Sequence, residues 1–407
     1  MVTSPIIISR ENSSDQATEL YFIGRPPSGD SPALQAREVY GALRHELSAR
    51  GACIFSERIF ATVEAMPEIE QERTPVLGDL DDGIPPTLVA VEPGAAGAFA
   101  GIQVHAIAAA SSLEAINWSI GQSGDPPAVN DMTCISHSAA CQATTAVRAR
   151  QLTLGAGRWV FISGLTHDGA APPGEQAAEV FRTAGAFLRH INGSMRSVVR
   201  TWLWLRDICS WYADFNTTRN AFFSSEGLIP TDGSRPRLPA STGIGLGSTA
   251  GEAVMLDLIA VPGREEHIHF LEAAGEQQSA FAYGSAFSRA AVASTPGGTT
   301  VFISGTASID PSGRTEHAGD IEAQIDATIT HVRALLHQVG CGDRHILSAL
   351  VYCKTPQVEK AYTAREPRPV WPRLTLIGDV CRPDLLFEIE LTAALAAGDG
   401  SSDGGRM

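Results

Sequence analysis

The chain has 407 residues, of which 44% are hydrophobic and 18% charged, a composition typical of a globular protein with enough material for two or three domains. Its formal net charge of −15 argues against nucleic acid and anionic membranes as partners, because both require a basic face. An anionic small molecule would need a locally positive pocket. The sequence shows no apolar stretch of membrane-spanning length and no signal-peptide pattern, which predicts a cytoplasmic protein.

The first third of the chain gives the weakest signals. Residues 84–93 and 101–109 have the apolar and β-branched character of strands, with a Gly/Ala-rich turn between them. We expect residues 1–129 to complete the first domain or to form a cap on it.

An internal repeat organises the rest of the chain. Residues 159–165 (WVFISGL) and 300–306 (TVFISGT) are short apolar segments that contain the same Ile-Ser-Gly sequence. Each is followed by an amphipathic helix, a second strand, another helical stretch and a closing apolar strand. This order predicts an α+β fold built from two tandem domains. We place the two domains at 130–262 and 280–396, with a linker at 263–279 and a disordered tail at 397–407.

The seven cysteines are scattered and lack CxxC spacing. They predict neither a disulfide framework nor a zinc site, and we expect free thiols and no bound metal.

The second copy resembles the YjgF/RidA family in residues 303–324 and 373–390. The first copy resembles the chorismatase branch in residues 200–223 and 238–245, and so does the segment 283–290. Because family members usually form trimers with sites between neighbouring domains, the resemblance implies two YjgF/RidA-like domains with pseudo-trimeric packing, as a monomer or a homotrimer. It also implies an enzyme that releases pyruvate from chorismate.

Cleavage of the enol ether of chorismate requires a proton at the enol methylene, cationic groups for two carboxylates, and exclusion of bulk water. We expect no cofactor. In LLFEIE, strand alternation places Glu388 and Glu390 on one sheet face, where apolar neighbours would raise the pKa of Glu388. The resemblance implies that Glu388 is the proton donor. Without the resemblance, the simpler interpretation would be that Glu388 is exposed on a solvated strand face. In the first copy, Met255 corresponds to Glu388 and Asp257 corresponds to Glu390. Because the first copy therefore lacks the acid, we expect one site per chain.

Several residues are candidates for binding the substrate. Tyr212 and Arg219 lie seven residues apart, on one face of a predicted helix, and an arginine can bind a carboxylate through two parallel hydrogen bonds. A surface arginine packed over aromatic rings is the alternative for Arg219. Ser241, Thr242 and Gly243 would offer hydroxyls and close backbone approach, or simply form a turn.

The second copy adds four further candidates. Gly305 leaves room for the substrate ring, and Thr306 follows it in the same strand. Arg373 resembles the keto-acid-binding arginine of the YjgF/RidA family, and Arg382 is a second cationic candidate. Cys381 together with Gly305 resembles the branch that forms 3-hydroxybenzoate, which implies a catalytic role for Cys381 in directing the product.

Three alternatives remain at this point. A hydrolytic chorismatase would give a dihydroxycyclohexadiene carboxylate instead of 3-hydroxybenzoate. An imine or enamine deaminase of the RidA type would use Arg373 and Glu388 in a cleft between subunits. A third possibility is a non-enzymatic domain that binds a metabolite or a partner protein.

Overall fold

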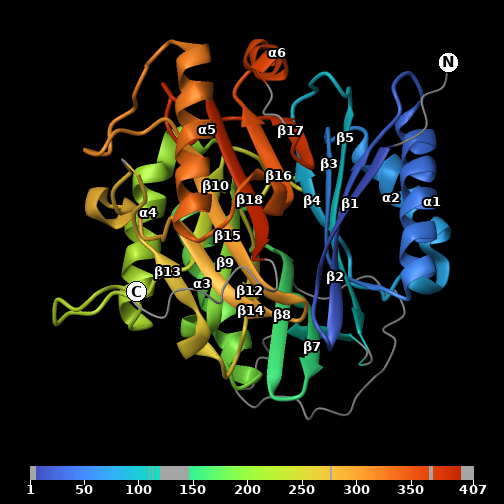
Figure 1. Cartoon of the computed structure of the whole chain (residues 1–407), viewed down its shortest axis with the longest axis horizontal. Coiled ribbons are helices and arrows are strands. Elements are labelled where there is room, and N and C mark those ends of the chain that lie inside the picture. The colour runs from blue at the N-terminus through green and yellow to red at the C-terminus, as the bar shows by residue number, and fades with distance from the viewer. Residues whose placement is uncertain are drawn as a thin grey trace.

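The computed structural model describes residues 6–109, 111, 113–119, 146–275, 277–365 and 370–395. These residues form three six-stranded sheets of mixed direction, with strand orders β1-β2-β5-β3-β4-β11, β10-β9-β12-β8-β7-β6 and β13-β14-β15-β18-β16-β17. In Figure 1 the sheets meet in the middle of the molecule and the long helices lie at its periphery.

Each sheet, with its helices, defines one unit of the chain. The first unit contains β1 (Ile6–Ser13), β2 (Ala17–Arg25), α1 (Pro32–Arg50), β3 (Cys53–Ala61), α2 (Met66–Leu77), β4 (Thr87–Ala90) and β5 (Phe99–Ala109). The second unit contains β6 (Glu114–Ser119), β7 (Ala146–Leu154), β8 (Gly157–Leu165), α3 (Pro173–His190), β9 (Val198–Leu205), α4 (Ile208–Ser225), β10 (Ala240–Ile244) and β12 (Val254–Ala260). The third unit contains β13 (His269–Leu271), β14 (Ala290–Thr295), β15 (Gly298–Ala307), α5 (Ile321–Gln338), β16 (Ile346–Cys353), α6 (Pro356–Arg365), β17 (Arg373–Ile377) and β18 (Phe387–Leu395).

The three units share one order of elements. Each has an antiparallel hairpin, a helix, a strand, a second helix, a strand parallel to the previous one, and a closing strand inserted into the sheet between the hairpin and that pair. The predicted α+β fold with domain repetition and pseudo-trimeric packing is confirmed. Helix α5 begins directly after Asp320, whose side chain accepts a hydrogen bond from the backbone N–H of Ala323.

Hydrophobic packing follows the same threefold plan. Separate buried clusters fill the space between sheet and helices in the first, second and third units. A further cluster draws on all three sheets, and includes Phe60, Trp204 and Tyr352 from the equivalent strands β3, β9 and β16. The sheets therefore pack against one another through their helix-free faces, as three domains of one chain.

The expectation for residues 1–129 was wrong. Only β6 completes the sheet of the second unit, whereas β1–β5 form a sheet with its own helices and core. The reason lies in buried charges, which interrupt the apolar pattern of β3. Glu57 accepts hydrogen bonds from Arg73 and from the hydroxyl of Tyr40, and Arg58 pairs with Asp257 of the second unit at 2.7 Å.

Two further boundaries need correction. The predicted linker at 263–279 contains β13, which is the edge strand of the third sheet because it pairs with β14. The short strand β11 (Gly247–Ser248) pairs with β4, so the second unit also extends the sheet of the first. The predicted tail at 397–407 lies outside the described residues.

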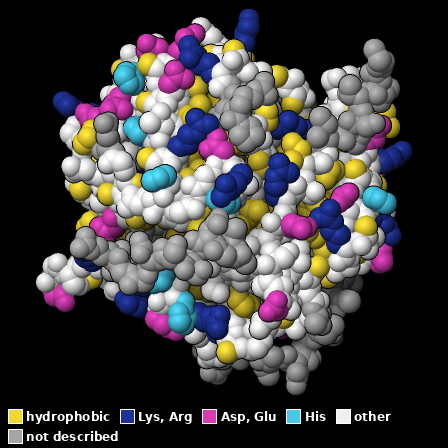
Figure 2. All heavy atoms as spheres, viewed as in Figure 1, with side chains coloured by type: hydrophobic (Ala, Val, Ile, Leu, Met, Phe, Trp, Pro, Cys, Tyr) yellow, Lys and Arg dark blue, Asp and Glu magenta, His cyan; other side chains and the backbone are white. Residues whose placement is uncertain are grey.

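Charge on the visible surface is mixed in sign. Acidic and basic side chains alternate on the face shown in Figure 2, without a continuous basic stripe. Among the described residues, no helix is both long and apolar enough to span a membrane.

The buried pair of Glu57 and Arg73 should stabilise the first unit. The side chains are 0% and 5% exposed and 2.6 Å apart, so Glu57→Ala would leave Arg73 and the hydroxyl of Tyr40 without this partner. We expect the variant to lose about 3–5 kcal/mol of unfolding free energy in denaturant titrations. Glu72→Ala, which removes an exposed pair with Arg37, is the control and should change stability little. A small loss in Glu57→Ala, equal to that of the control, would contradict the stabilising role.

Candidate functional site

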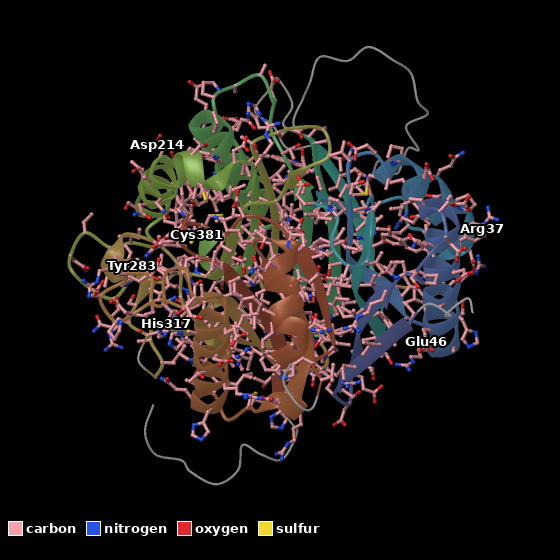
Figure 3. The ribbon with its side chains drawn as sticks, turned by 90° about the horizontal axis from the view of Figure 1, so that it is seen from above. Arg37, Glu46, Asp214, Tyr283, His317 and Cys381 are labelled. Carbon is pink, nitrogen blue, oxygen red and sulfur yellow. The ribbon has the colours of Figure 1, made fainter. Side chains whose placement is uncertain are left out.

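A cavity lies between the second and third units. It is bounded by α4 on one side and by β15, β18 and the segments preceding β14 and β18 on the other. In Figure 3 two of its residues, Cys381 and Tyr283, lie on the same side of the molecule, opposite Arg37 and Glu46 of the first unit. The lining residues are Tyr212, Tyr283, Ser285, Phe287, Arg289, Gly305, Ala307, Ile309, Cys381, Arg382, Leu385 and Glu388.

Strand alternation in β18 directs Glu388 into this cavity. Phe387 and Ile389 belong to the helix-side core of the third unit, so Glu388 and Glu390 face the second unit. Both carboxyl groups are buried, with residues 5% and 3% exposed. The predicted shared face of the two glutamates is therefore present.

A β-bulge at Ser304 and Gly305 opens space beside Glu388. The register of β15 against β18 shifts between Ile303 and Thr306, which leaves Gly305 out of the regular ladder. Its N–H donates instead to Oγ1 of Thr242, at 3.0 Å. A Cβ at position 305 would lie 2.0 Å from Oε1 of Glu388, so only glycine fits this carboxyl position.

The second glutamate of the strand is fully engaged. Oε2 of Glu390 accepts from Arg200 at 2.6 Å, and Oε1 accepts from Nε1 of Trp202 at 2.7 Å. Arg200 also donates to the hydroxyl of Thr242 at 2.5 Å. Glu390 is thereby held as a carboxylate directly beside Glu388.

Burial raises the pKa of Glu388 from its ordinary 4.5 to about 8. The negative charge of Glu390 acts in the same direction, while Arg200 and Arg289 partly oppose the rise in this pKa. Glu388 is therefore mostly protonated at neutral pH, as a general acid must be.

Two arginines line the cavity. Arg382 was predicted as a binding residue, and it donates to the backbone oxygen of Gly313 at 2.7 Å while its guanidinium lies over the ring of Tyr283. Arg289 was not predicted. It donates to the oxygen of Gln278 and to the hydroxyl of Tyr283, at 3.0 and 2.8 Å. Together they give the cavity the local positive charge that an anionic ligand requires.

Four of the missed lining residues come from one segment. Tyr283, Ser285, Phe287 and Arg289 all belong to YGSAFSRA at 283–290, which leads into β14. This segment was noted only for its family resemblance. Its single arginine was the available signal.

Tyr212 lines the cavity, whereas Arg219 is not among the lining residues. Arg219 interacts with the Tyr212 hydroxyl through a side-chain hydrogen bond and donates to Oδ1 of Asn216 at 2.6 Å. Its guanidinium also lies over the rings of Phe215 and Phe287. The prediction that Arg219 grips a ligand carboxylate is not supported by this placement, because Arg219 is not among the lining residues and its guanidinium packs against aromatic rings.

Cys381 lies in the cavity wall. Burial, reinforced by the charge of Glu388, raises the pKa of its thiol to about 12. The residue is consequently a neutral thiol at physiological pH, and the reactive thiolate form is disfavoured.

The other predicted residues of the second unit join the two units. Ser241 accepts from Thr201 through its hydroxyl, and its N–H donates to Oγ of Ser304 at 2.8 Å. Thr242 connects Arg200 to Gly305, and Gly243 leaves space toward Tyr212. These three residues support the wall behind Gly305.

Thr306 and Arg373 point away from the cavity. The hydroxyl of Thr306 donates to the oxygen of Ser304 at 2.9 Å. Arg373, at the start of β17, donates to the hydroxyl of Tyr362 on α6 at 3.0 Å, within the helix-side core. Its predicted role in ligand binding is not supported, because it faces the side of the sheet opposite Glu388.

The two equivalent clefts carry no acid at this position. In strand register Glu388 corresponds to Met255 in β12 and to Gly101 in β5. At Gly101 the gap is closed, since a Cβ there would lie 2.3 Å from the oxygen of Gly24 and 2.8 Å from Leu374. Within the described residues, the interface between the second and third units is therefore the one of the three that carries a buried acid at the position of Glu388. No group of three or more His, Cys, Asp or Glu side chains in this part of the chain is arranged to hold a metal ion.

Comparison with solved structures shows the fold. A crystal structure of chorismatase matches over 97% of this chain and 100% of its own, with 17% identity and a TM-score of 0.57. A protein of the conserved Rid family from Yersinia pestis matches 31% of this chain and 99% of its own, with 22% identity and a TM-score of 0.27. RidA from the Antarctic bacterium Psychrobacter matches 31% of this chain and 99% of its own, with 16% identity and a TM-score of 0.25. No protein-family model and no curated protein matches the sequence.

The buried acid should make stability depend on pH. The folded state keeps a proton on Glu388 that the unfolded state loses above its ordinary pKa of 4.5, so this group costs stability as pH rises from about 4.5 to about 8. We expect Glu388→Gln to be a few kcal/mol more stable than the parent protein at pH 8–9 and equal to it below pH 4.5, measured by denaturant titration. Glu175→Gln, at an exposed position in the first turn of α3, should show no such difference. Identical pH profiles for Glu388→Gln and the parent would contradict the shifted pKa.

Proposed function

We propose that this chain is a chorismatase, which cleaves the enolpyruvyl ether of chorismate and releases pyruvate with Glu388 as the general acid. The observation that carries the proposal is a buried, protonated carboxyl group in a cavity lined by two arginines. The likeness of fold to the chorismatase structure over nearly the whole chain supports it.

Protonation is the step that this site serves. A proton from Glu388 adds to the methylene carbon of the enol ether and leaves a cationic carbon stabilised by the ether oxygen. In the hydrolytic route water attacks that carbon, and the hemiketal breaks its bond to the ether oxygen as pyruvate forms. In the route to 3-hydroxybenzoate the hydroxyl of the substrate attacks it instead. The cyclic ketal then releases pyruvate by breaking its bond to the ether oxygen and the bond between the ring and the attacking oxygen, and the ring loses a proton to become aromatic while the ether oxygen gains one. In the hydrolytic route one water is consumed, whereas elimination to 3-hydroxybenzoate consumes none overall. The proton lost by the attacking oxygen restores Glu388.

The charge of the cavity suits this substrate. Chorismate carries two carboxylates, and Arg289 and Arg382 provide two guanidinium groups in the lining. Tyr212 supplies a hydroxyl whose pKa burial raises to about 12, so it is available as a hydrogen-bond donor, and Arg219 interacts with it through a side-chain hydrogen bond. An arginine binds a carboxylate more specifically than a lysine because it offers two parallel donors.

The alternatives are less well supported. A deaminase of the RidA type was expected to combine Arg373 with Glu388, and these side chains lie on opposite faces of the third sheet. A non-enzymatic binding domain gives no account of a protonated glutamate facing a positively charged cavity. The hydrolytic chorismatase remains the second candidate, because it would use the same acid and the same arginines.

A direct assay tests the function. We expect the purified protein to release pyruvate from chorismate, with a rate that falls as pH rises through about 8, where Glu388 loses its proton. Glu388→Gln keeps the shape of the side chain but cannot donate the proton, so its kcat should fall about 10²–10⁴-fold with little change in KM. Coupled detection of pyruvate measures both, with Glu175→Gln as the control. Activity of Glu388→Gln within about threefold of the parent would exclude Glu388 as the acid.

The organic product is proposed to be 3-hydroxybenzoate, with Cys381 directing the outcome. The polarizable, neutral thiol in the wall would contact the reacting edge of the ring as it reorganises, so Cys381→Ala should keep pyruvate release but move the product toward the non-aromatic diol. Gly305→Ala should instead slow the reaction, because its methyl group would displace the carboxyl of Glu388. Chromatography of the products decides the matter. Diol alone from the parent enzyme would refute the branch, and unchanged 3-hydroxybenzoate from Cys381→Ala would refute the steering role.

A further inference from the structure

The charged groups around Glu388 are few and come from identifiable elements. Glu390 lies on the same strand, Arg200 on β9, and Arg289 just before β14. Tyr352 on β16, Tyr212 on α4 and Cys381 before β18 also face this carboxyl. These last three are neutral at physiological pH, because burial raises the pKa of each.

Glu390 is therefore the one negative charge among these groups. It is two residues from Glu388 on the same face, which separates the two positions by about 6.6–6.8 Å along the strand. Its carboxylate is fixed by Arg200 at 2.6 Å and by Trp202 at 2.7 Å, and the pair of Arg200 and Glu390 is almost fully buried. The pair also offsets part of the positive charge of Arg200, which favours the ionised form of Glu388.

We infer that Glu390 is a positioning residue for the acid: its ion-paired carboxylate keeps the neighbouring carboxyl of Glu388 protonated at working pH. Removing this charge has two effects in the same direction. The repulsion that disfavours ionised Glu388 is lost, and the uncompensated guanidinium of Arg200 then favours the ionised form. The inference rests on the proposed function, since its main readout is the release of pyruvate.

The test is the pH profile of kcat/KM for Glu390→Gln. We expect the alkaline limb to move to lower pH by about 1 to 2 units, because charges at this separation interact strongly in a buried site. Glu390→Asp keeps the charge and should retain the limb of the parent. A folded Glu390→Gln whose limb stays within about 0.3 units of the parent would overturn the inference.

The chain supplies a matched control in the preceding repeat. Asp257 occupies the register position of Glu390 and pairs with Arg58 at 2.7 Å, but the acid position beside it is Met255. Asp257→Asn removes a buried charge of the same kind from the equivalent interface. Its alkaline limb should remain at the parent position, even where the variant is less stable. A limb shifted as in Glu390→Gln would show a general structural effect and overturn the inference.

A second variant tests the inference in case Glu390→Gln alone does not fold. In Glu390→Gln the new amide N–H group faces the indole N–H of Trp202, and this conflict is relieved in the double variant Trp202→Phe/Glu390→Gln. The double variant should show the same acidic shift, with Trp202→Phe alone as its control. An unshifted limb in the folded double variant would also overturn the inference.

A measurement without substrate separates this inference from the proposed function. Denaturant titration reports the proton on Glu388 directly, and Glu390→Gln should reduce the loss of stability between pH 4.5 and 8. If the parent releases no pyruvate while this change is seen, the function fails and the inference stands. If pyruvate is released but neither profile changes, the inference fails and the function stands.

Discussion

The buried ion pair between Arg200 and Glu390 is the contact on which the site depends. Moving two charges out of water is costly, and further hydrogen bonds to the pair offset part of that cost. Here Trp202 and Thr242 supply the additional hydrogen bonds. Thr242 in turn receives the N–H of Gly305, which opens the space for Glu388. The interface between two units and the environment of the acid are thus parts of one network, so neither can be changed independently.

The same interface recurs around the molecule with different chemistry. Gln103, Asp257 and Glu390 occupy equivalent register positions in the closing strands, and they contact Ser348, Arg58 and Arg200 of a neighbouring unit. A trimer of identical subunits would have to place the same residues in every cleft. Joining the units in one chain removes that constraint, so one cleft can hold a buried acid while another is closed by backbone and leucine.

The sequence predicted the features that depend on local patterns. Alternation in LLFEIE placed Glu388 and Glu390 on one face, and the repeated Ile-Ser-Gly strands revealed the duplication. The first unit escaped notice because Glu57 and Arg58 break the apolar pattern of β3, and only tertiary pairing explains their burial. Arg289 and Arg373 were misjudged for a related reason. The cavity is formed where two units meet, and spacing along one strand does not tell which side of the sheet an arginine will face.

If the proposed function is correct, the bound substrate raises the pKa of the acid that protonates it. Arg289 opposes protonation of Glu388 in the free enzyme, together with Arg200. A carboxylate bound to Arg289 would neutralise part of that influence and add a negative charge of its own to the cavity, and both effects favour the protonated form. Closure of the cavity by the ligand would exclude water and increase them further. The acid of the complex would then remain protonated to higher pH than that of the free enzyme, so binding of the dianion and proton delivery would be coupled through a single arginine.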